Sequence, residues 1–199
     1  MTDTENQRAG FAAIIGAPNA GKSTLVNRLT GTKVSIVTQK VQTTRFPVRG
    51  IAIEGNAQIV LVDTPGIFTP RRRLDRAMVA SAWGGASDAD VVVHLIDAAS
   101  HIASEGKEGQ AADRRSAEDT ETIIANLKAS NTQVILALNK IDGMRRDTLL
   151  ALSHAMFETG VYSEVYMISA LSGDGVDDLK QRLARSMPAG HWLYPEDQS

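Results

Sequence analysis

The residues Gly16–Ser23 (GAPNAGKS) place two glycines, a lysine and a serine at the spacing G-x-x-x-x-G-K-[ST]. They follow the apolar run Phe11–Ile15 and open a predicted helix, Lys22–Thr30. In this context, backbone N–H groups and the positive end of the helix can hold a chain of phosphates. Lys22 would reach the β- and γ-phosphates, and the Ser23 hydroxyl would bind Mg²⁺. A glycine-rich turn is the alternative, but the flanking strand and helix favour a phosphate-binding loop.

A second motif, Asp63–Gly66 (DTPG), follows the predicted strand Gln58–Val62. An acidic residue at the carboxyl end of a strand in an α/β sheet faces the crevice where ligands bind. Asp63 could hold Mg²⁺ through water, and the Gly66 N–H could meet a γ-phosphate. Taken alone, these four residues are equally compatible with an ordinary turn.

A third motif, Asn139–Asp142 (NKID), follows the apolar run Gln133–Asn139. The Asp142 carboxylate can accept the N1–H and N2–H₂ donors of guanine, a pair that adenine lacks, so an ATPase is disfavoured. Lys140 can lie over the base, and Asn139 can brace the loop.

A fourth motif, Ser169–Leu171 (SAL), follows the next predicted strand. Here the Ala170 N–H could donate to guanine O6, although three such residues carry little information alone. All four motifs occur in order, each at the carboxyl end of a strand. This series predicts a site for a guanine nucleotide.

The rest of the chain alternates apolar, β-branched runs with helical segments, as in an α/β fold. Gly55-Asn56 separates two runs and predicts a hairpin. We expect a six-stranded, mostly parallel sheet with one antiparallel strand and helices on both faces. The predicted strands are Phe11–Ile15, Val48–Glu54, Gln58–Val62, Val91–Asp97, Gln133–Asn139 and Val165–Ile168, and the predicted helices are Lys22–Thr30, Leu74–Trp83, Thr120–Ala129, Thr148–Glu158 and Val176–Met187.

Two segments interrupt this pattern. Ser100–Ser116 is small, polar and charged, which predicts a mobile surface insertion. The segment 188–199 contains two prolines and predicts a linker, with Trp192 and Tyr194 as packing residues. His94 lies within an apolar strand and is expected to be a core histidine.

Composition sets further bounds. The chain has 199 residues, 43% of them hydrophobic, which suits one well-buried domain. A net charge of −2 gives no global positive field for nucleic acid or anionic lipid. Because the chain has no cysteine and a polar start, we expect an intracellular soluble protein.

The motif series resembles the TRAFAC class of P-loop GTPases. With Gln42–Arg45 (QTTR) added, the chain is similar to the Era family, within the TrmE–Era–EngA group. The resemblance implies a P-loop GTPase domain (G domain) that binds and hydrolyses GTP in small-subunit ribosome assembly and rRNA maturation. The nucleotide-binding residues that it implies are Gly16, Ala17, Pro18, Asn19, Ala20, Gly21, Lys22, Ser23, Thr24, Asp63, Thr64, Pro65, Gly66, Asn139, Lys140, Asp142, Ser169, Ala170 and Leu171.

By this resemblance, Mg²⁺ is held by Ser23, Asp63 and a threonine of the first switch loop. We favour Thr44 over Thr43 as that threonine. The residues expected to serve catalysis are Lys22, Thr44, Gly66 and Asn19.

Asn19 has two alternative roles. Ile67, after DTPG, cannot orient water as glutamine does in many GTPases. Related GTPases that lack the glutamine and carry this asparagine use K⁺, so Asn19 is a candidate K⁺ ligand. The alternative is that Asn19 only shapes the loop. Slow hydrolysis, in a domain that acts mainly as a binding switch of the Era or EngA type with another RNA or protein partner, also stays open.

The resemblance covers residues from Phe11 into the tail, where Tyr194–Gln198 (YPEDQ) is similar to the segment before a second domain, an RNA-binding KH domain. We expect no counterpart of that domain within these 199 residues. We expect a flexible N-terminus over 1–9, a G domain over 10–187 and a linker over 188–199.

The implied partners are small-subunit ribosomal RNA and the pre-ribosomal small subunit, reached mainly through the KH domain. Arg71–Arg73 could meet RNA, but a solvated loop is the simpler interpretation. The resemblance also implies a monomer, and a cytoplasmic location with a peripheral pool at the inner membrane.

Overall fold

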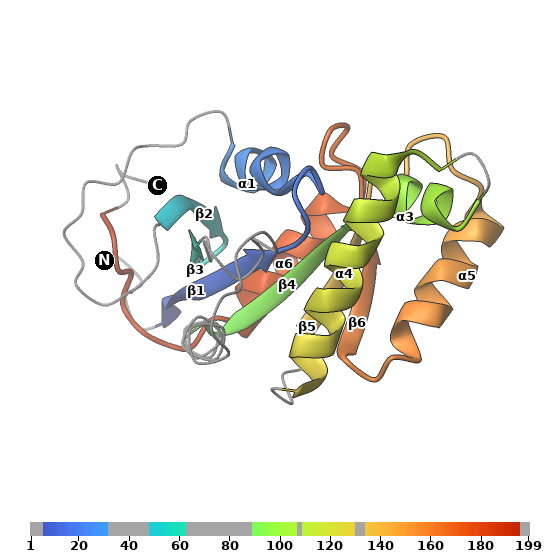
Figure 1. Cartoon of the computed structure of the whole chain (residues 1–199). Coiled ribbons are helices and arrows are strands. Elements are labelled where there is room, and N and C mark those ends of the chain that lie inside the picture. Colours follow the sequence, from blue (N-terminus) through green and yellow to red (C-terminus); the bar gives the residue numbers. More distant parts are fainter. Residues whose placement is uncertain (1–5, 32–47, 63–88, 107–108, 130–133, 196–199) are drawn as a thin grey trace.

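Six strands form one sheet in the order β2-β3-β1-β4-β5-β6 in the computed structural model (Figure 1), which describes residues 6–31, 48–62, 89–106, 109–129 and 134–195. Only β2 and β3 pair antiparallel among these strands, so the predicted α/β sheet is confirmed. The strands are β1 (Arg8–Ile15), β2 (Val48–Glu54), β3 (Ala57–Val62), β4 (Val91–Asp97), β5 (Val134–Asn139) and β6 (Tyr162–Met167). The helices are α1 (Lys22–Thr30), α3 (Ala98–Glu105), α4 (Ala111–Ala129), α5 (Arg146–Phe157) and α6 (Val176–Ser186). The predicted helix Leu74–Trp83 lies outside the described residues.

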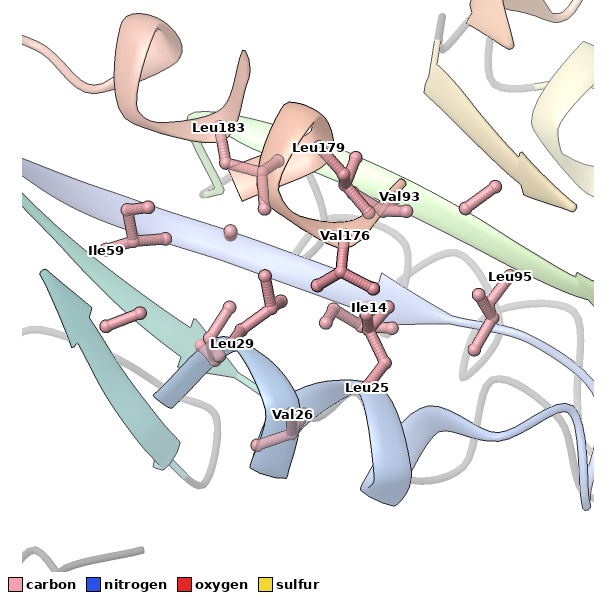
Figure 2. Close-up of a cluster of buried hydrophobic side chains, with 14 of the residues drawn as sticks. Ile14, Leu25, Val26, Leu29, Ile59, Val93, Leu95, Val176, Leu179 and Leu183 are labelled. Carbon is pink, nitrogen blue, oxygen red and sulfur yellow. The ribbon is translucent and has the colours of Figure 1, made fainter. Parts of the chain in front are cut away.

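Helices cover both faces of the sheet because successive strand residues point to opposite sides. Ile14 packs on the face covered by α1 and α6, beside Leu25 and Leu179 (Figure 2). Ile15 packs on the other face, in the cluster that holds Ile123 of α4 and side chains of α5. The strands β3 and β5 are buried along their whole length, as continuous apolar runs require in a covered sheet.

The predicted mobile insertion over Ser100–Ser116 is wrong where the structure describes it. Ala98–Glu105 forms α3, and α4 begins at Ala111. Asp97 caps α3, because its Oδ1 accepts the Ser100 N–H at 2.9 Å. The Ser100 hydroxyl in turn donates to Asp113 Oδ1 at 2.6 Å and links the two helices. α3 and the first half of α4 are poor in large apolar side chains, so polar contacts between them supply order that hydropathy does not signal.

Both ends of the described chain join the sheet. β1 begins at Arg8, so Arg8 and Ala9 are part of the sheet rather than of a flexible N-terminus. Gln58, which is buried in β3, anchors the segment 188–195. Its side chain accepts the N–H groups of Leu193 (2.8 Å) and Tyr194 (3.0 Å) and donates to the Tyr194 carbonyl (2.9 Å). Tyr194 is buried, as predicted for a packing residue.

His94 is the core histidine that the sequence predicted. It is fully buried in β4, and its Nδ1 lies 2.8 Å from the Tyr162 hydroxyl. Burial, with smaller contributions from the charges of Lys22 and His101, lowers the pKa of His94 to about 3. Burial raises the pKa of Tyr162. The pair is therefore neutral at ordinary pH.

Among the helices that the structure describes, none has both the length and the apolar surface that spanning a bilayer requires.

Candidate nucleotide-binding site

The loop between β1 and α1 takes the form that a phosphate-binding loop requires. The Lys22 ammonium donates to the carbonyls of Gly16 (2.8 Å) and Ala17 (2.9 Å), which folds its side chain across the loop. Gly16 has no space for a side chain, because a Cβ there would lie 2.4 Å from the Leu95 carbonyl oxygen. No side chain of the described residues caps α1 at Gly21. The amides of the first turn therefore face outward, where anions bind.

An open cleft of about 190 Å³ lies beside this loop. Lys22 and Ser23 line it together with Arg49 of β2. A hydroxyl oxygen next to a phosphate site fits Mg²⁺, which usually combines few protein ligands with phosphate oxygens. Ser23 lines this cleft, and its role as a metal ligand stays a prediction.

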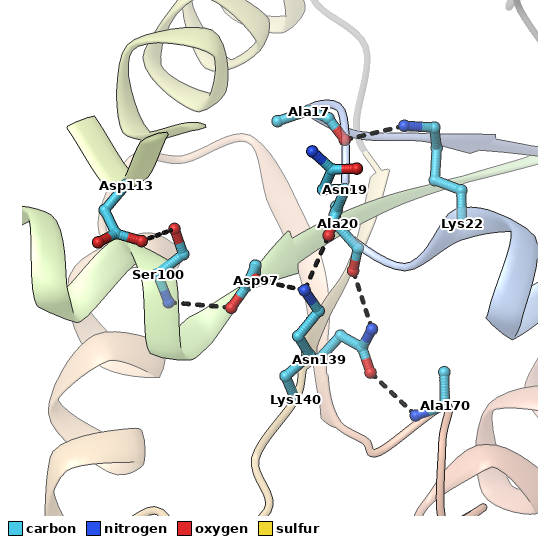
Figure 3. Close-up of polar contacts among 10 residues, drawn as sticks. All are labelled: Ala17, Asn19, Ala20, Lys22, Asp97, Ser100, Asp113, Asn139, Lys140 and Ala170. Carbon is cyan, nitrogen blue, oxygen red and sulfur yellow. Dashed lines mark hydrogen bonds and ion pairs between the residues drawn. The ribbon is translucent and has the colours of Figure 1, made fainter. Parts of the chain in front are cut away.

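Asn139 joins the phosphate-binding loop to the loop after β6. Its side-chain amide donates to the Ala20 carbonyl at 2.9 Å, and its Oδ1 accepts the Ala170 N–H at 2.9 Å (Figure 3). The side chain is buried, so both polar ends need these partners. The predicted bracing role of Asn139 is visible in these two bonds. The Ala170 N–H is already engaged, so a bond to guanine O6 would have to share this donor.

Lys140 also joins its own loop to the phosphate-binding loop. Its ammonium donates to the Asn19 carbonyl at 2.9 Å and lies 2.6 Å from Asp97 Oδ2 (Figure 3). Asn19 and Lys140 both have positive φ, at 65° and 62°. Asparagine tolerates this left-handed region better than most residues, which favours the loop-shaping role of Asn19 but does not bear on K⁺.

Two residues at the site escaped the sequence analysis. Arg28 of α1 donates from Nε to the Ala170 carbonyl at 3.2 Å and from Nη2 to the Leu171 carbonyl. Asp97 lies at the end of β4 and holds Lys140. Neither belongs to a motif, although an acidic residue at the carboxyl end of a parallel strand was a usable signal for Asp97.

The structure thus brings the phosphate-binding loop, the Asn139–Asp142 loop and the Ser169–Leu171 loop to one edge of the sheet. Ser169 is buried, whereas Asp142 and Leu171 are exposed. The other predicted site residues lie outside the described residues. They are Thr44, Asp63, Thr64, Pro65 and Gly66.

Comparisons with known proteins agree with this geometry. Residues 11–140 match the family described as 50S ribosome-binding GTPase. GTPase Era of Caulobacter vibrioides is 66% identical over 200 residues, which cover 100% of this chain and 63% of the relative. GTPase Era of Maricaulis maris is 56% identical over 198 residues, with the same coverage. The chain therefore spans less than two thirds of the curated relatives it matches.

Solved structures point the same way. An Era variant of Aquifex aeolicus bound to GDP·AlF₄⁻ superimposes with a TM-score of 0.68 at 37% identity, over 96% of this chain and 61% of that one. Era in complex with MgGDPNP and nucleotides 1506–1542 of 16S ribosomal RNA gives a TM-score of 0.67 at 37% identity, with the same coverage. The FeoB G-domain of Methanococcus jannaschii, at 24% identity and a TM-score of 0.54, shows the fold alone. With the loop geometry, these matches show that the chain belongs to the 50S ribosome-binding GTPase family and resembles the GTPase portion of Era.

Proposed function

We propose that this chain binds GTP and hydrolyses it to GDP and phosphate, as the switch domain of an Era-type protein. One observation carries the proposal. The loop that begins at Asn139 contacts the phosphate-binding loop through Asn139 and Lys140, and the Ser169–Leu171 loop through Asn139. A nucleotide bound at this edge would thus contact hydrogen-bond donors for its phosphates and polar groups for its base, in loops that are bonded to one another.

The chain's own residues would act mainly by positioning and by charge. Lys22 would leave the carbonyls of Gly16 and Ala17 to contact the β- and γ-phosphates, and the amides at the start of α1 would stabilise negative charge in the transition state. Water would attack the γ-phosphorus in line with the leaving GDP oxygen. A bound Mg²⁺ would neutralise phosphate charge, with Ser23 as one ligand and Thr44 and Asp63 as further proposed ligands.

Base specificity provides the sharpest test. Affinities of GTP, GDP, ATP and XTP should be measured for the wild type and for Asp142→Asn. Guanine nucleotides should bind far better than ATP to the wild type, because ATP leaves the Asp142 carboxylate without its donor pair. The Asn variant should shift preference toward XTP. Equal binding of ATP and GTP by the wild type would contradict the proposal.

The cellular role proposed here is small-subunit ribosome assembly and rRNA maturation. It is supported by 66% identity to a GTPase Era across the whole chain and by the 16S rRNA held in an Era structure. The matched family is described by the 50S subunit. The Era relatives match the whole chain, at up to 66% identity, so we base the proposed role on them. The RNA would be held mainly by a KH domain that Era-type proteins carry beyond this region.

Binding of a 16S rRNA 3′ fragment tests this division of labour. This chain alone, with a net charge of −2, should bind the fragment weakly. A tight, salt-sensitive complex with this chain alone would contradict it. We further propose a cytoplasmic monomer with a peripheral pool at the inner membrane, which sedimentation and cell fractionation would check.

A second candidate is a binding switch whose hydrolysis only resets it slowly. Ile67 in place of a water-orienting glutamine favours this alternative. Single-turnover hydrolysis should be measured with and without pre-ribosomal small subunits. Slow GTP hydrolysis that the subunits do not accelerate would favour a binding switch over the GTP-hydrolysing enzyme of the main proposal.

A further inference from the structure

We propose that Asp97 is a positioning residue for nucleotide binding, and that it acts by fixing the side chain of Lys140. The inference rests on the proposed guanine-nucleotide site and adds a residue that no motif contains. Asp97 ends β4 and pairs in register with Asn139, which ends β5. The Asp97 carboxylate therefore lies at the carboxyl edge of the sheet, opposite the residue that precedes Lys140.

The two oxygens of Asp97 have separate partners. Oδ1 accepts the Ser100 N–H at 2.9 Å and caps α3, whereas Oδ2 lies 2.6 Å from the Lys140 ammonium. The Asp97 side chain is only 11% exposed. Its cap holds the carboxylate in one orientation, so Oδ2 is a fixed anchor for the ammonium rather than one conformer of a surface ion pair.

Lys140 needs such an anchor. Its side chain is a flexible four-carbon stem that is 45% exposed, and its backbone already adopts a left-handed conformation at φ 62°. The ammonium has two fixed partners, the Asn19 carbonyl and Asp97 Oδ2. Together they stretch the stem across the gap between the two loops, where it can cover one face of a bound base. Without Asp97, the stem would have to be ordered by the nucleotide itself, at a cost in affinity.

The helix cap and the anchor can be separated by substitution. In Asp97→Asn, the side-chain oxygen can still accept the Ser100 N–H, because asparagine is as good a helix cap as aspartate. The amide NH₂ would then face the Lys140 ammonium, and the charge-assisted bond would be lost. Asp97→Ser also keeps a capping oxygen and lacks the charge, so it serves as a second variant of the same kind.

The test measures release of a fluorescent GDP analogue from the wild type, Asp97→Asn, Asp97→Ser, Lys140→Met and the double variant Asp97→Asn/Lys140→Met. Ser100→Ala is the matched control, because its hydroxyl contacts Asp113 and not Lys140. Asp97→Asn should release the analogue about tenfold faster than the wild type, and Asp97→Ser should do likewise. Ser100→Ala should match the wild type.

The double variant distinguishes positioning from a general structural role. If Asp97 acts through Lys140, the double variant should release the analogue no faster than Lys140→Met alone. Multiplicative effects of the two substitutions, or an unchanged rate in both Asp97 variants beside faster release in Lys140→Met, would overturn this inference and leave the proposed function intact. A wild type that does not bind the analogue would overturn the proposed function, and this inference with it.

Discussion

Gly21 packs against the side-chain amide of Asn139 so closely that a Cβ on Gly21 would lie 2.3 Å from Asn139 Nδ2. Gly21 also has φ 104°, in the region that favours glycine. The same amide donates to the Ala20 carbonyl. The phosphate-binding loop and the base-binding loop therefore meet at a contact that only glycine permits.

This contact predicts that Gly21→Ala weakens GDP binding about tenfold or more, because the methyl group would displace Asn139 and strain the backbone. Titration calorimetry would measure the loss. Gly31→Ala is the matched control. Gly31 also has a positive φ, 77°, but an added Cβ there meets nothing within 4 Å. If both variants lost affinity equally, backbone strain rather than the Asn139 contact would be responsible.

The contacts of Arg28 predict that the Ser169–Leu171 loop contributes to nucleotide binding. Arg28→Met keeps most of the aliphatic stem but removes the donors to the Ala170 and Leu171 carbonyls. The loop should become less ordered, and GDP affinity should fall by about three- to tenfold. Arg145→Met, which removes an exposed pair with Asp147, should leave affinity unchanged. If Arg28→Met bound GDP as tightly as the wild type, the contacts of the guanidinium with the loop would not contribute to nucleotide binding.

The role of Asn19 can be tested without disturbing its backbone. Glycine accepts φ 65°, so Asn19→Gly removes the side-chain oxygen with less strain than alanine would cause. If Asn19 binds K⁺, the wild type should hydrolyse GTP faster in KCl than in NaCl at equal ionic strength, and the variant should show no such difference. Equal wild-type rates in the two salts would leave Asn19 with the loop-shaping role alone.

His94 predicts a pH dependence of stability. Its pKa is about 3 in the folded chain against an ordinary value of 6.5, so the unfolded chain binds the proton more readily. The stability that the neutral ring contributes is therefore complete above pH 6.5 and is lost as the pH falls from 6.5 toward 3. The free energy of unfolding should fall by about 2 kcal/mol between pH 7 and pH 5 from this residue alone.

Urea unfolding at the two pH values would measure the change. His94→Gln has no titrating group at this position, and its stability should change less over the same interval. The comparison uses the difference between pH values, so a lower overall stability of the variant does not affect it. An identical pH dependence in both proteins would show that other groups dominate.

The sequence was most informative where a hydropathy pattern or a motif determines the local structure. The bounds of β2 and β4 agree with their apolar runs, and α1 begins and ends at the predicted residues. β6 begins at Tyr162, three residues before the predicted Val165, because this edge strand alternates with polar residues such as Glu164 that hide its start.

Contacts between distant residues could not be predicted in the same way. Asp97 and Lys140 are 43 positions apart, and Arg28 lies 142 positions from Ala170. Asp97 and Lys140 meet because the parallel strands β4 and β5 bring their carboxyl ends to one edge. Arg28 instead reaches the Ala170 carbonyl from within α1. The motifs correctly located the loops, whereas the residues that hold the loops in place emerged only from the folded structure.

The two ends of the described chain meet far from this edge. The Gly190 N–H donates to the Gln7 carbonyl at 3.0 Å, and Arg8 forms a bridge with Ala189. The eight residues of β1 separate this meeting point from the phosphate-binding loop by roughly 25 Å. A short peptide joining Gln7 to Gly190 would therefore suit a circular permutant of this region.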